Sequence, residues 1–233
     1  MILAAGMGTR LRPLTDTMPK ALVPVEGQPM IARLVNHLAA FGYDDIVVNV
    51  HHFADMLEHF LSENGNPRCK IAISDERDLL RDTGGAIRHA AELLRKGADN
   101  RFLVHNVDII TDFDLSLLDK AAEGTLATLL VSDRATSRYL MFDDSMRLAG
   151  WTNITTGEVR SPYPGLKPED CTLRAFSGIH NLSLDVLPLM EGWPEKFSII
   201  DFYLDICSRY TIKGLDAGTV PVRDLGKIAD FAG

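Results

Sequence analysis

Hydrophobic residues in the first third of the chain follow two alternating patterns. Short, mostly apolar runs at 1–5, 46–50 and 70–74 predict strands, and the β-branched run 46–50 is typical of a strand buried on both faces. Between them, apolar residues recur at helical spacing over 31–38 and 53–61, which predicts two amphipathic helices. The order strand, helix, strand, helix, strand favours a doubly wound, Rossmann-like α/β fold, with a mostly parallel mixed sheet and helices on both faces.

The rest of the chain is expected to extend this sheet. Strands are predicted at 102–105, 127–131, 139–142, 148–151, 175–180, 212–217 and 219–223, and helices at 82–96, at 115–122 and from 198 onward. The segment 155–170 is rich in glycine, proline and charge, which predicts a loop or flap. A length of 233 residues is usual for one α/β domain, so we expect a single domain, 1–233, made of halves at about 1–110 and 111–233.

Composition narrows the range of partners. The net charge is −8, which argues against an electrostatic nucleic-acid binder. The 3 cysteines lie far apart, without a C-x-x-C pair, so reduced thiols in a cytoplasmic protein are expected rather than a zinc knuckle or a disulfide framework. No apolar run approaches the length of a membrane span, and the short apolar start does not resemble a signal peptide. We expect no nucleic-acid and no membrane partner, and the sequence is compatible with a homo-oligomer.

The most informative stretch is the glycine-containing loop after the first strand. Gly6 and Gly8 allow backbone torsions and close approaches that side chains would forbid, and Arg10 and Lys20 bring two cations to the same neighbourhood. Exposed N–H groups of such a loop can converge on an anion, which predicts a site for a nucleoside triphosphate. The dinucleotide pattern G-x-G-x-x-G fails because Leu11 stands at its third glycine, and no Gly-Lys-Ser/Thr of a P-loop follows.

Other polar residues follow the strand ends that should share an edge with this loop. In a doubly wound sheet, ligands bind beyond the carboxyl ends of the strands. His51-His52, Ser74-Asp75-Glu76 and Asp108 all follow predicted strands. An acid at this edge, facing a phosphate loop, is a candidate metal ligand, and the alternative is a helix cap.

The run from Leu3 to Lys20 resembles, without a gap, the signature G-x-G-T-R-L-x-P-L-T followed by P-K of sugar-1-phosphate nucleotidyltransferases. The resemblance implies that the first half binds nucleotide and the second half binds sugar, that Arg10 and Lys20 are catalytic, and that Asp108 and Asp224 hold Mg²⁺. The implied nucleotide-binding residues are Leu3, Ala4, Ala5, Gly6, Gly8, Thr9, Arg10, Lys20, Glu76, Thr83, Gly84 and Gly85. The implied sugar-binding residues are Asn106, Gly150 and Gly178.

Several of these positions have alternative interpretations. The segment around Gly84 predicts a helix start whose first N–H groups are open to a ligand, and the alternative is a flexible helix entry. Gly178 also suits a bulge in a packed strand. Glu76 stands where family members often have glutamine, and a carboxylate only accepts hydrogen bonds, so the base stays open. Val107 replaces a family glycine, which places a β-branched side chain where backbone normally approaches the ligand.

The lysine that family members use to bind the sugar phosphate has no clear counterpart. Lys167, Arg160 and Arg174 are the candidate cations. No G-x-S-x-G nucleophile motif is present, and covalent catalysis is not indicated.

Within this family, the chain resembles the short single-domain form, and most of all the N-acetylmuramate-1-phosphate uridylyltransferases. The expected reaction is therefore transfer of a uridylyl group from UTP to N-acetylmuramate 1-phosphate or a related hexose 1-phosphate. A GTP:mannose-1-phosphate guanylyltransferase and a CTP:phosphocholine cytidylyltransferase are alternatives within the family. A non-catalytic, nucleotide-sensing regulatory subunit is the alternative of another class.

Overall fold

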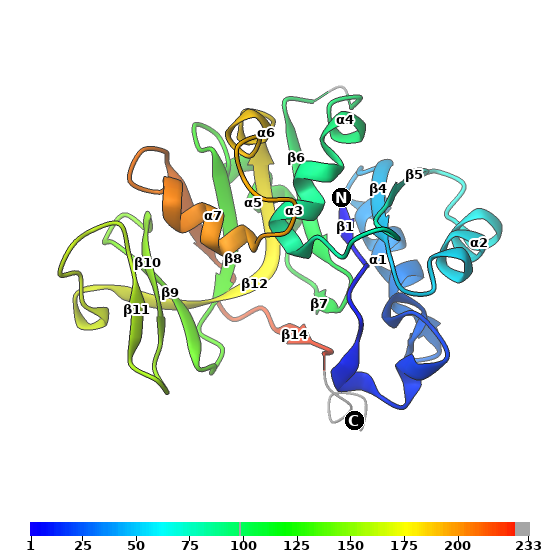
Figure 1. The fold of residues 1–233 in the computed structure, drawn as a ribbon, viewed down its shortest axis with the longest axis horizontal. Coiled ribbons are helices and arrows are strands. Elements are labelled where there is room, and N and C mark those ends of the chain that lie inside the picture. Colours follow the sequence, from blue (N-terminus) through cyan, green and yellow to red (C-terminus); the bar gives the residue numbers. More distant parts are fainter. Residues whose placement is uncertain (98, 227–233) are drawn as a thin grey trace.

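The first half of the chain forms the parallel part of a sheet. The structure, a computed structural model, describes residues 1–97 and 99–226 (Figure 1). The elements of this half are β1 (Ile2–Leu3), β2 (Pro24–Val25), β3 (Gln28–Pro29), α1 (Met30–Ala40), β4 (Asp45–Val50), α2 (Ala54–Asn64), β5 (Lys70–Asp75), α3 (Asp82–His89), α4 (Ala91–Leu94) and β6 (Arg101–Asn106). Strands β6, β1, β4 and β5 lie side by side in that order and are all parallel. We call these elements the parallel half.

The second half continues the same sheet with mainly antiparallel strands. Its elements are β7 (Ile109–Thr111), α5 (Leu115–Ala121), β8 (Ala127–Ser132), β9 (Arg138–Phe142), β10 (Leu148–Asn153), β11 (Glu158–Arg160), β12 (Thr172–Ser183), α6 (Val186–Leu189), α7 (Ile199–Ile206), β13 (Ile212–Asp216) and β14 (Val222–Asp224). The long strand β12 pairs antiparallel with β6, β8 and β9, whereas β13 pairs parallel with β8. We call these elements the mixed half. The resulting sheet of 10 strands confirms the predicted mixed α/β architecture.

Helices cover both faces of the sheet, as predicted. Along β4, Ile46 and Val48 belong to one hydrophobic core with residues of α1, α2 and α5, whereas Val47 belongs to another core with residues of α3, α4, α6 and α7. Successive side chains of a strand point to opposite faces, so a continuous apolar run fills two cores at once.

Three predicted segments differ from the structure. The strand expected over 219–223 begins only at Val222, in β14. The helix expected over 82–96 is divided at Ala90 into α3 and α4. The expected flap 155–170 contains β11, which extends the sheet by pairing with β10, and a short 3₁₀ turn at Pro168–Asp170. β11 carries no apolar run because it lies at the edge and its side chains are exposed or half-buried. No helix in the described residues is long and apolar enough to cross a membrane.

A small antiparallel pair brings the end of the described chain to the loop that follows β1. β14 pairs with β7, and Asp224 lies opposite Ile109. Figure 1 shows β14 running below β12 toward the N-terminal loop. The remainder of the predicted second half, residues 227–233, lies outside the described residues.

The two halves meet where β6 pairs with β12, and each strand carries a buried histidine there. Ile179 pairs with His105 and His180 pairs with Val104. Burial lowers the pKa of His105 to about 4 and that of His180 to about 3. Nδ1 of His180 lies 2.6 Å from the hydroxyl of Tyr203 on α7. Both rings are therefore neutral at physiological pH.

Candidate active site

The loop after β1 is shaped by Gly8 more than by Gly6. Gly8 has φ +61°, and a Cβ at this position would lie 2.7 Å from the Thr15 side chain. The hydroxyl of Thr15 donates to the carbonyl of Gly8 at 2.8 Å, which closes the loop. A Cβ at Gly6 would meet no atom of the described residues within 4 Å. The loop itself thus requires glycine at position 8, whereas the space beside Gly6 belongs to the pocket that this residue borders.

A pocket of about 370 Å³ lies beyond the carboxyl ends of β1, β4, β5 and β6. It is lined by Leu3, Ala5, Gly6, Lys20, Asn49, Glu76, Leu80, Asp82, Thr83, Asn106, Val107, Asp108 and Lys196. The structure therefore brings the glycine loop, Glu76, Thr83, Asn106 and Asp108 together at one site, as the order of strands led us to expect. Thr9, Arg10, Gly84, Gly85, Gly150, Gly178 and Asp224 do not line this pocket.

Glu76 and Asn49 hold the start of the glycine loop. The Asn49 side-chain oxygen accepts from the backbone N–H groups of Ala4 and Ala5 at 2.7 and 3.3 Å, and its amide donates to Glu76 at 2.9 Å. The other oxygen of Glu76 accepts from the Arg81 N–H at 3.1 Å, and the residue is 0% exposed. Both carboxylate oxygens are thus engaged by protein donors, and contact with a base stays a prediction. Sequence reasoning missed Asn49, although an amide within the apolar run 46–50 was a visible signal.

The four charged residues of the predicted site form two cation–acid groups. The ammonium of Lys20 contacts the carboxylate of Asp108, and both side chains are 12% exposed. Arg10 and Asp224 lie together against Gly226, where a Cβ would lie 2.5 Å from the guanidinium and 2.8 Å from the carboxylate. The Leu225 N–H donates to the Asp108 carbonyl at 2.9 Å and joins the two groups. The predicted partners therefore lie at one place, with each acid beside a cation.

Asp108 and Asp224 are a suitable donor set for Mg²⁺ that also binds phosphate. No three His, Cys, Asp or Glu side chains among residues 1–97 and 99–226 gather closely enough to hold a metal ion by themselves. Mg²⁺ is usually held by one or two carboxylates together with phosphate oxygens and water. One oxygen of each carboxylate is engaged, by Lys20 at Asp108 and by the Gly226 N–H at Asp224, whereas the other oxygen receives no hydrogen bond from the described residues.

The start of α3 corrects one prediction about Gly84 and Gly85. Both N–H groups donate to the carbonyl of Phe197, at 2.9 and 3.2 Å, so they are not open to a ligand. A Cβ at either glycine would lie 2.3 Å from an atom of the 195–197 segment. These glycines allow that segment to pack against α3. Thr83 lines the pocket and accepts from the Ile199 N–H at 2.9 Å.

The 195–197 segment presents a cation that sequence reasoning missed. Lys196 lines the same pocket as Lys20 and forms no ion pair with the described residues. The three candidates from sequence are each paired: Arg160 with Asp201, Arg174 with Asp216 and Lys167 with Glu169. Lys196 reaches the pocket through hydrogen bonds between residues more than a hundred positions apart, so no local pattern marks it.

The predicted sugar-binding residues occupy two different places. Gly178 has φ +71° and lies where the pairing of β12 and β8 shifts, so the interpretation as a bulge is confirmed. A Cβ there would lie 2.6 Å from the Asn106 side chain, so Gly178 gives room to a residue of the pocket. Gly150 instead packs against Arg160 and Ser161, where a Cβ would lie 3.0 Å from the Arg160 carbonyl.

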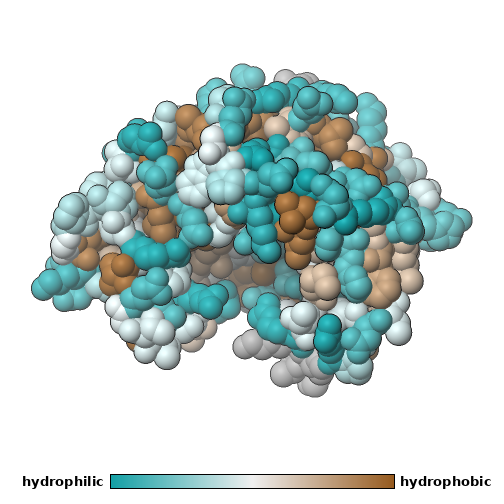
Figure 2. Space-filling view, in the orientation of Figure 1, coloured by the Kyte–Doolittle hydropathy of each residue, from teal (hydrophilic) through white to brown (hydrophobic). Residues whose placement is uncertain are grey.

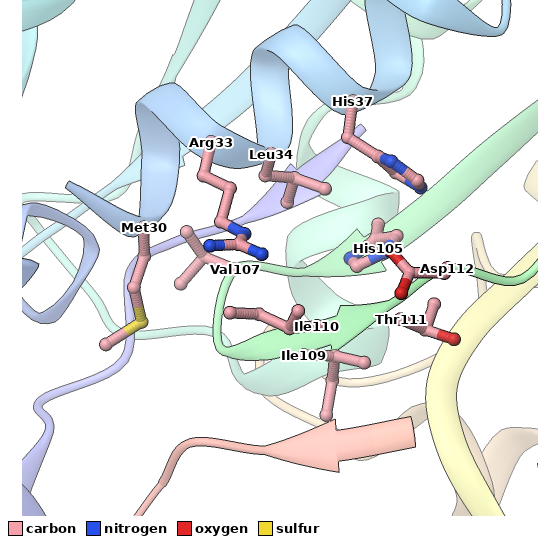
Figure 3. A pocket seen from close by; sticks show the side chains of 10 residues that line it. All are labelled: Met30, Arg33, Leu34, His37, His105, Val107, Ile109, Ile110, Thr111 and Asp112. Atoms are coloured by element: carbon pink, nitrogen blue, oxygen red, sulfur yellow. The ribbon is translucent and has the colours of Figure 1, made fainter. Parts of the chain in front are cut away.

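Val107 is less disruptive than its sequence position suggests. It is 3% exposed and packs in the core that includes α1. It also lines a small cavity of about 80 Å³, and Figure 3 shows it beside Arg33 of α1. The side chain that replaces a family glycine therefore packs in the core and also borders the ligand pocket.

Comparisons with known proteins identify the family of this chain. A family model described as "Nucleotidyl transferase" matches residues 1–141. An N-acetylmuramate alpha-1-phosphate uridylyltransferase of Caulobacter vibrioides is 46% identical over 112 residues, which are 47% of this chain and 45% of that protein. A UTP–glucose-1-phosphate uridylyltransferase of Synechocystis sp. is 33% identical over 249 residues, which cover 99% of this chain and 61% of that protein. This chain thus spans less than two thirds of the length of either relative.

The fold also recurs in solved structures. The crystal structure of HddC from Yersinia pseudotuberculosis complexed with GMP-PN superposes with a TM-score of 0.75, covering 99% of this chain and 95% of that one. The two sequences are 22% identical, so this similarity concerns the fold alone.

Proposed function

Because the chain belongs to the nucleotidyl transferase family, we propose that it is an enzyme that transfers a nucleotidyl group from a nucleoside triphosphate to a sugar 1-phosphate. Pyrophosphate and a nucleotide sugar are the products. The observation that carries this proposal is the contact of Lys20 with Asp108 at a pocket bordered by the glycine loop. A cation and an acid at this position suit a reaction between two anions.

The sugar phosphate needs no general base to become a nucleophile. The second pKa of a phosphate monoester is about 6, so the attacking oxygen is already anionic at neutral pH. The obstacle is repulsion between two anions and the charge that builds on the departing pyrophosphate. Catalysis is then positioning and charge neutralisation by groups fixed in the protein.

Each charged group of the site has a role in this reaction. Arg10 binds the β and γ phosphates and stabilises the departing pyrophosphate, and the glycine-loop backbone supports the triphosphate. Lys20 lies beside the α-phosphate and the incoming phosphate. Lys196, which lines the same pocket, binds the incoming phosphate and takes the place of the lysine that we could not locate in the sequence. Asp108 and Asp224 would hold Mg²⁺, which when bound neutralises and aligns phosphate oxygens.

The specific substrates we propose are UTP and N-acetylmuramate 1-phosphate. This choice is supported by the name of the Caulobacter vibrioides relative and by its 46% identity over nearly half of the chain. The buried Glu76 accepts hydrogen bonds only, which suits the N3–H of uracil, although guanine also offers donors. GTP with mannose 1-phosphate is the second candidate for this reason.

Pyrophosphate release tests the proposal. Wild-type protein is incubated with Mg²⁺, with UTP, GTP, CTP or dTTP, and with N-acetylmuramate, glucose or mannose 1-phosphate or phosphocholine. We expect release only when both substrates are present, and fastest with UTP and N-acetylmuramate 1-phosphate. Thermal shift with each triphosphate alone reports binding independently, because a ligand that binds the native state raises its stability. Triphosphate binding without pyrophosphate release from any pair would indicate a non-catalytic, nucleotide-sensing subunit instead.

A further inference from the structure

A second cavity in the mixed half is lined by arginine and by apolar side chains. Its volume is about 320 Å³, and it lies between β9, β10 and β11 and the start of α7. Its lining consists of Arg134, Thr136, Arg138, Leu140, Trp151, Arg160, Phe176, Ser198 and Ile200. We call it the arginine cavity. Leu140 pairs with Trp151 across β9 and β10, and Trp151 pairs with Arg160 across β10 and β11. Paired residues of neighbouring strands point to the same face, so the cavity is built on the face of a sheet.

The arginine cavity adjoins the candidate active site at two places. A larger cavity of about 900 Å³ is lined by Arg10 and Asp224 and shares Arg134, Thr136 and Arg138 with it. On the other side, Ser198 and Ile200 line the arginine cavity, while Lys196 lines the glycine-loop pocket. Figure 2 shows the surface hollowed at its lower edge, between the strands of the mixed half and the N-terminal loop. A sugar phosphate bound by Lys20 and Lys196 is therefore placed beside the segment 196–200, which leads to the arginine cavity.

The charges of the arginine cavity are unbalanced. Among the described residues, none that lines this cavity is acidic, although the whole chain has a net charge of −8. Arg160 is paired with Asp201 at 2.6 Å and lies over the Trp151 ring at 4.3 Å, so its charge is partly offset. Arg134 and Arg138 form no ion pair with the described residues. Two free guanidinium groups in a concave site create a local positive field that favours an anion.

We infer that the arginine cavity binds an acidic substituent of the sugar phosphate, so that Arg134 and Arg138 hold a carboxylate carried by an ether group of the ring. The inference rests on the proposed function, because it concerns the second substrate of that reaction. A guanidinium fork matches a carboxylate in a bidentate manner. The apolar part of the lining, from Leu140, Trp151 and Phe176, suits a sugar ring and its alkyl substituents better than it suits departing pyrophosphate.

A matched pair of substrates isolates this contact. N-acetylmuramate 1-phosphate and N-acetylglucosamine 1-phosphate differ only by a carboxylate-bearing ether. Steady-state kinetics with each sugar and saturating UTP are measured for wild type, Arg134→Gln, Arg138→Gln and the double variant. Arg147→Gln is the control, because Arg147 is exposed in the same half and lines neither cavity. Thermal unfolding verifies that each variant folds.

We expect either single variant to lower kcat/KM for the acidic sugar about tenfold or more, since a hydrogen bond to a charged group is lost. The neutral sugar and the KM for UTP should change less than about twofold, and the control should match wild type for both sugars. Equal losses with both sugars would overturn the inference and assign the arginines to phosphate or pyrophosphate. Unchanged kinetics in the double variant, or a wild-type preference for the neutral sugar, would also overturn it. Absence of product from both sugars in wild type would instead count against the proposed function.

Discussion

The parallel half supplies residues to the site directly from successive strand ends, whereas the mixed half supplies them through long-range packing. Asn49 and Glu76 lie at or just after the carboxyl ends of adjacent strands, and one hydrogen bond joins them. In the mixed half, Lys196 and Asp224 reach the site only because α3 binds the 195–197 segment and β7 binds β14. The comparison indicates that the nucleotide pocket is formed by residues close to one another on neighbouring strands. Lys196 and Asp224, in contrast, take their positions only when the whole fold is assembled.

The largest expected effect is on the charge contacts where the halves meet. Lys20→Ala and Arg10→Ala should each lower turnover at least about a hundredfold, because losing a charge contact to the transition state costs about 2.7–4 kcal/mol. Pyrophosphate release at saturating Mg²⁺ and substrates is the measurement. Lys120→Ala, an exposed lysine on α5, is the control and should retain wild-type turnover. Rates close to wild type in either Lys20→Ala or Arg10→Ala would show that the charged groups have been assigned wrongly.

A smaller effect is expected when Val107 is replaced by the glycine that family members carry. Because Val107 is 3% exposed and packed in the core, Val107→Gly should destabilise the protein by about 2–4 kcal/mol, from lost apolar burial and added backbone freedom. Urea unfolding measures this change. Val159→Gly, at an exposed edge position, is the comparison and should cost about 1 kcal/mol or less. A Val107→Gly protein as stable as wild type would show that burial of this valine contributes little to the stability of the core.

Low pH should destabilise the protein through the two buried histidines where β6 pairs with β12. The pKa of His105 is lowered to about 4 and that of His180 to about 3, from 6.5, so the unfolded state binds more protons below pH 6.5. Stability is therefore full above pH 6.5 and is lost as pH falls toward the lowered values. Each histidine should cost roughly 2 kcal/mol at pH 5 relative to pH 7.

Urea unfolding at pH 7 and pH 5 measures this loss. The double variant His180→Leu/Tyr203→Phe removes one histidine together with its hydroxyl partner, and on acidification it should lose about 2 kcal/mol less stability than the wild type. His59→Gln, an exposed histidine, should behave as wild type. Equal stability of the wild type at both pH values would refute the assignment of buried neutral rings.

The smallest effects separate the two glycines of the loop. Gly8→Ala should destabilise the protein by about 1–2 kcal/mol, because its left-handed backbone is strained with a side chain. Gly6→Ala should change the free energy of unfolding by less than about 0.5 kcal/mol, since a Cβ there meets nothing within 4 Å. Its triphosphate affinity should nevertheless fall, which titration calorimetry with UTP and Mg²⁺ can measure. The reverse pattern, a destabilised Gly6→Ala with intact affinity, would place Gly6 in the scaffold.

Sequence patterns were most informative in the parallel half. The β-branched run 46–50 and the glycine loop predicted the correct strands and the edge of the sheet where their ends meet. Both patterns arise from residues that are close in the sequence, so they can be recognised there. Gly84 and Gly85 were assigned to a ligand because sequence does not show that Phe197 occupies their N–H groups. β11 was missed because an exposed edge strand of three residues has no apolar pattern. Arg134 and Arg138 had no motif, and their significance comes from the cavity that they share.

In the proposed reaction the sugar phosphate displaces pyrophosphate in a single step, so the nucleoside triphosphate and the sugar phosphate must both be bound. Exchange of labelled pyrophosphate into UTP, measured with Mg²⁺ in the presence and absence of sugar phosphate, tests this claim most directly. The account predicts no exchange with UTP and pyrophosphate alone, and exchange once N-acetylmuramate 1-phosphate is added. Exchange without any sugar phosphate would reveal a nucleotidyl group bound covalently to the protein and would contradict the account.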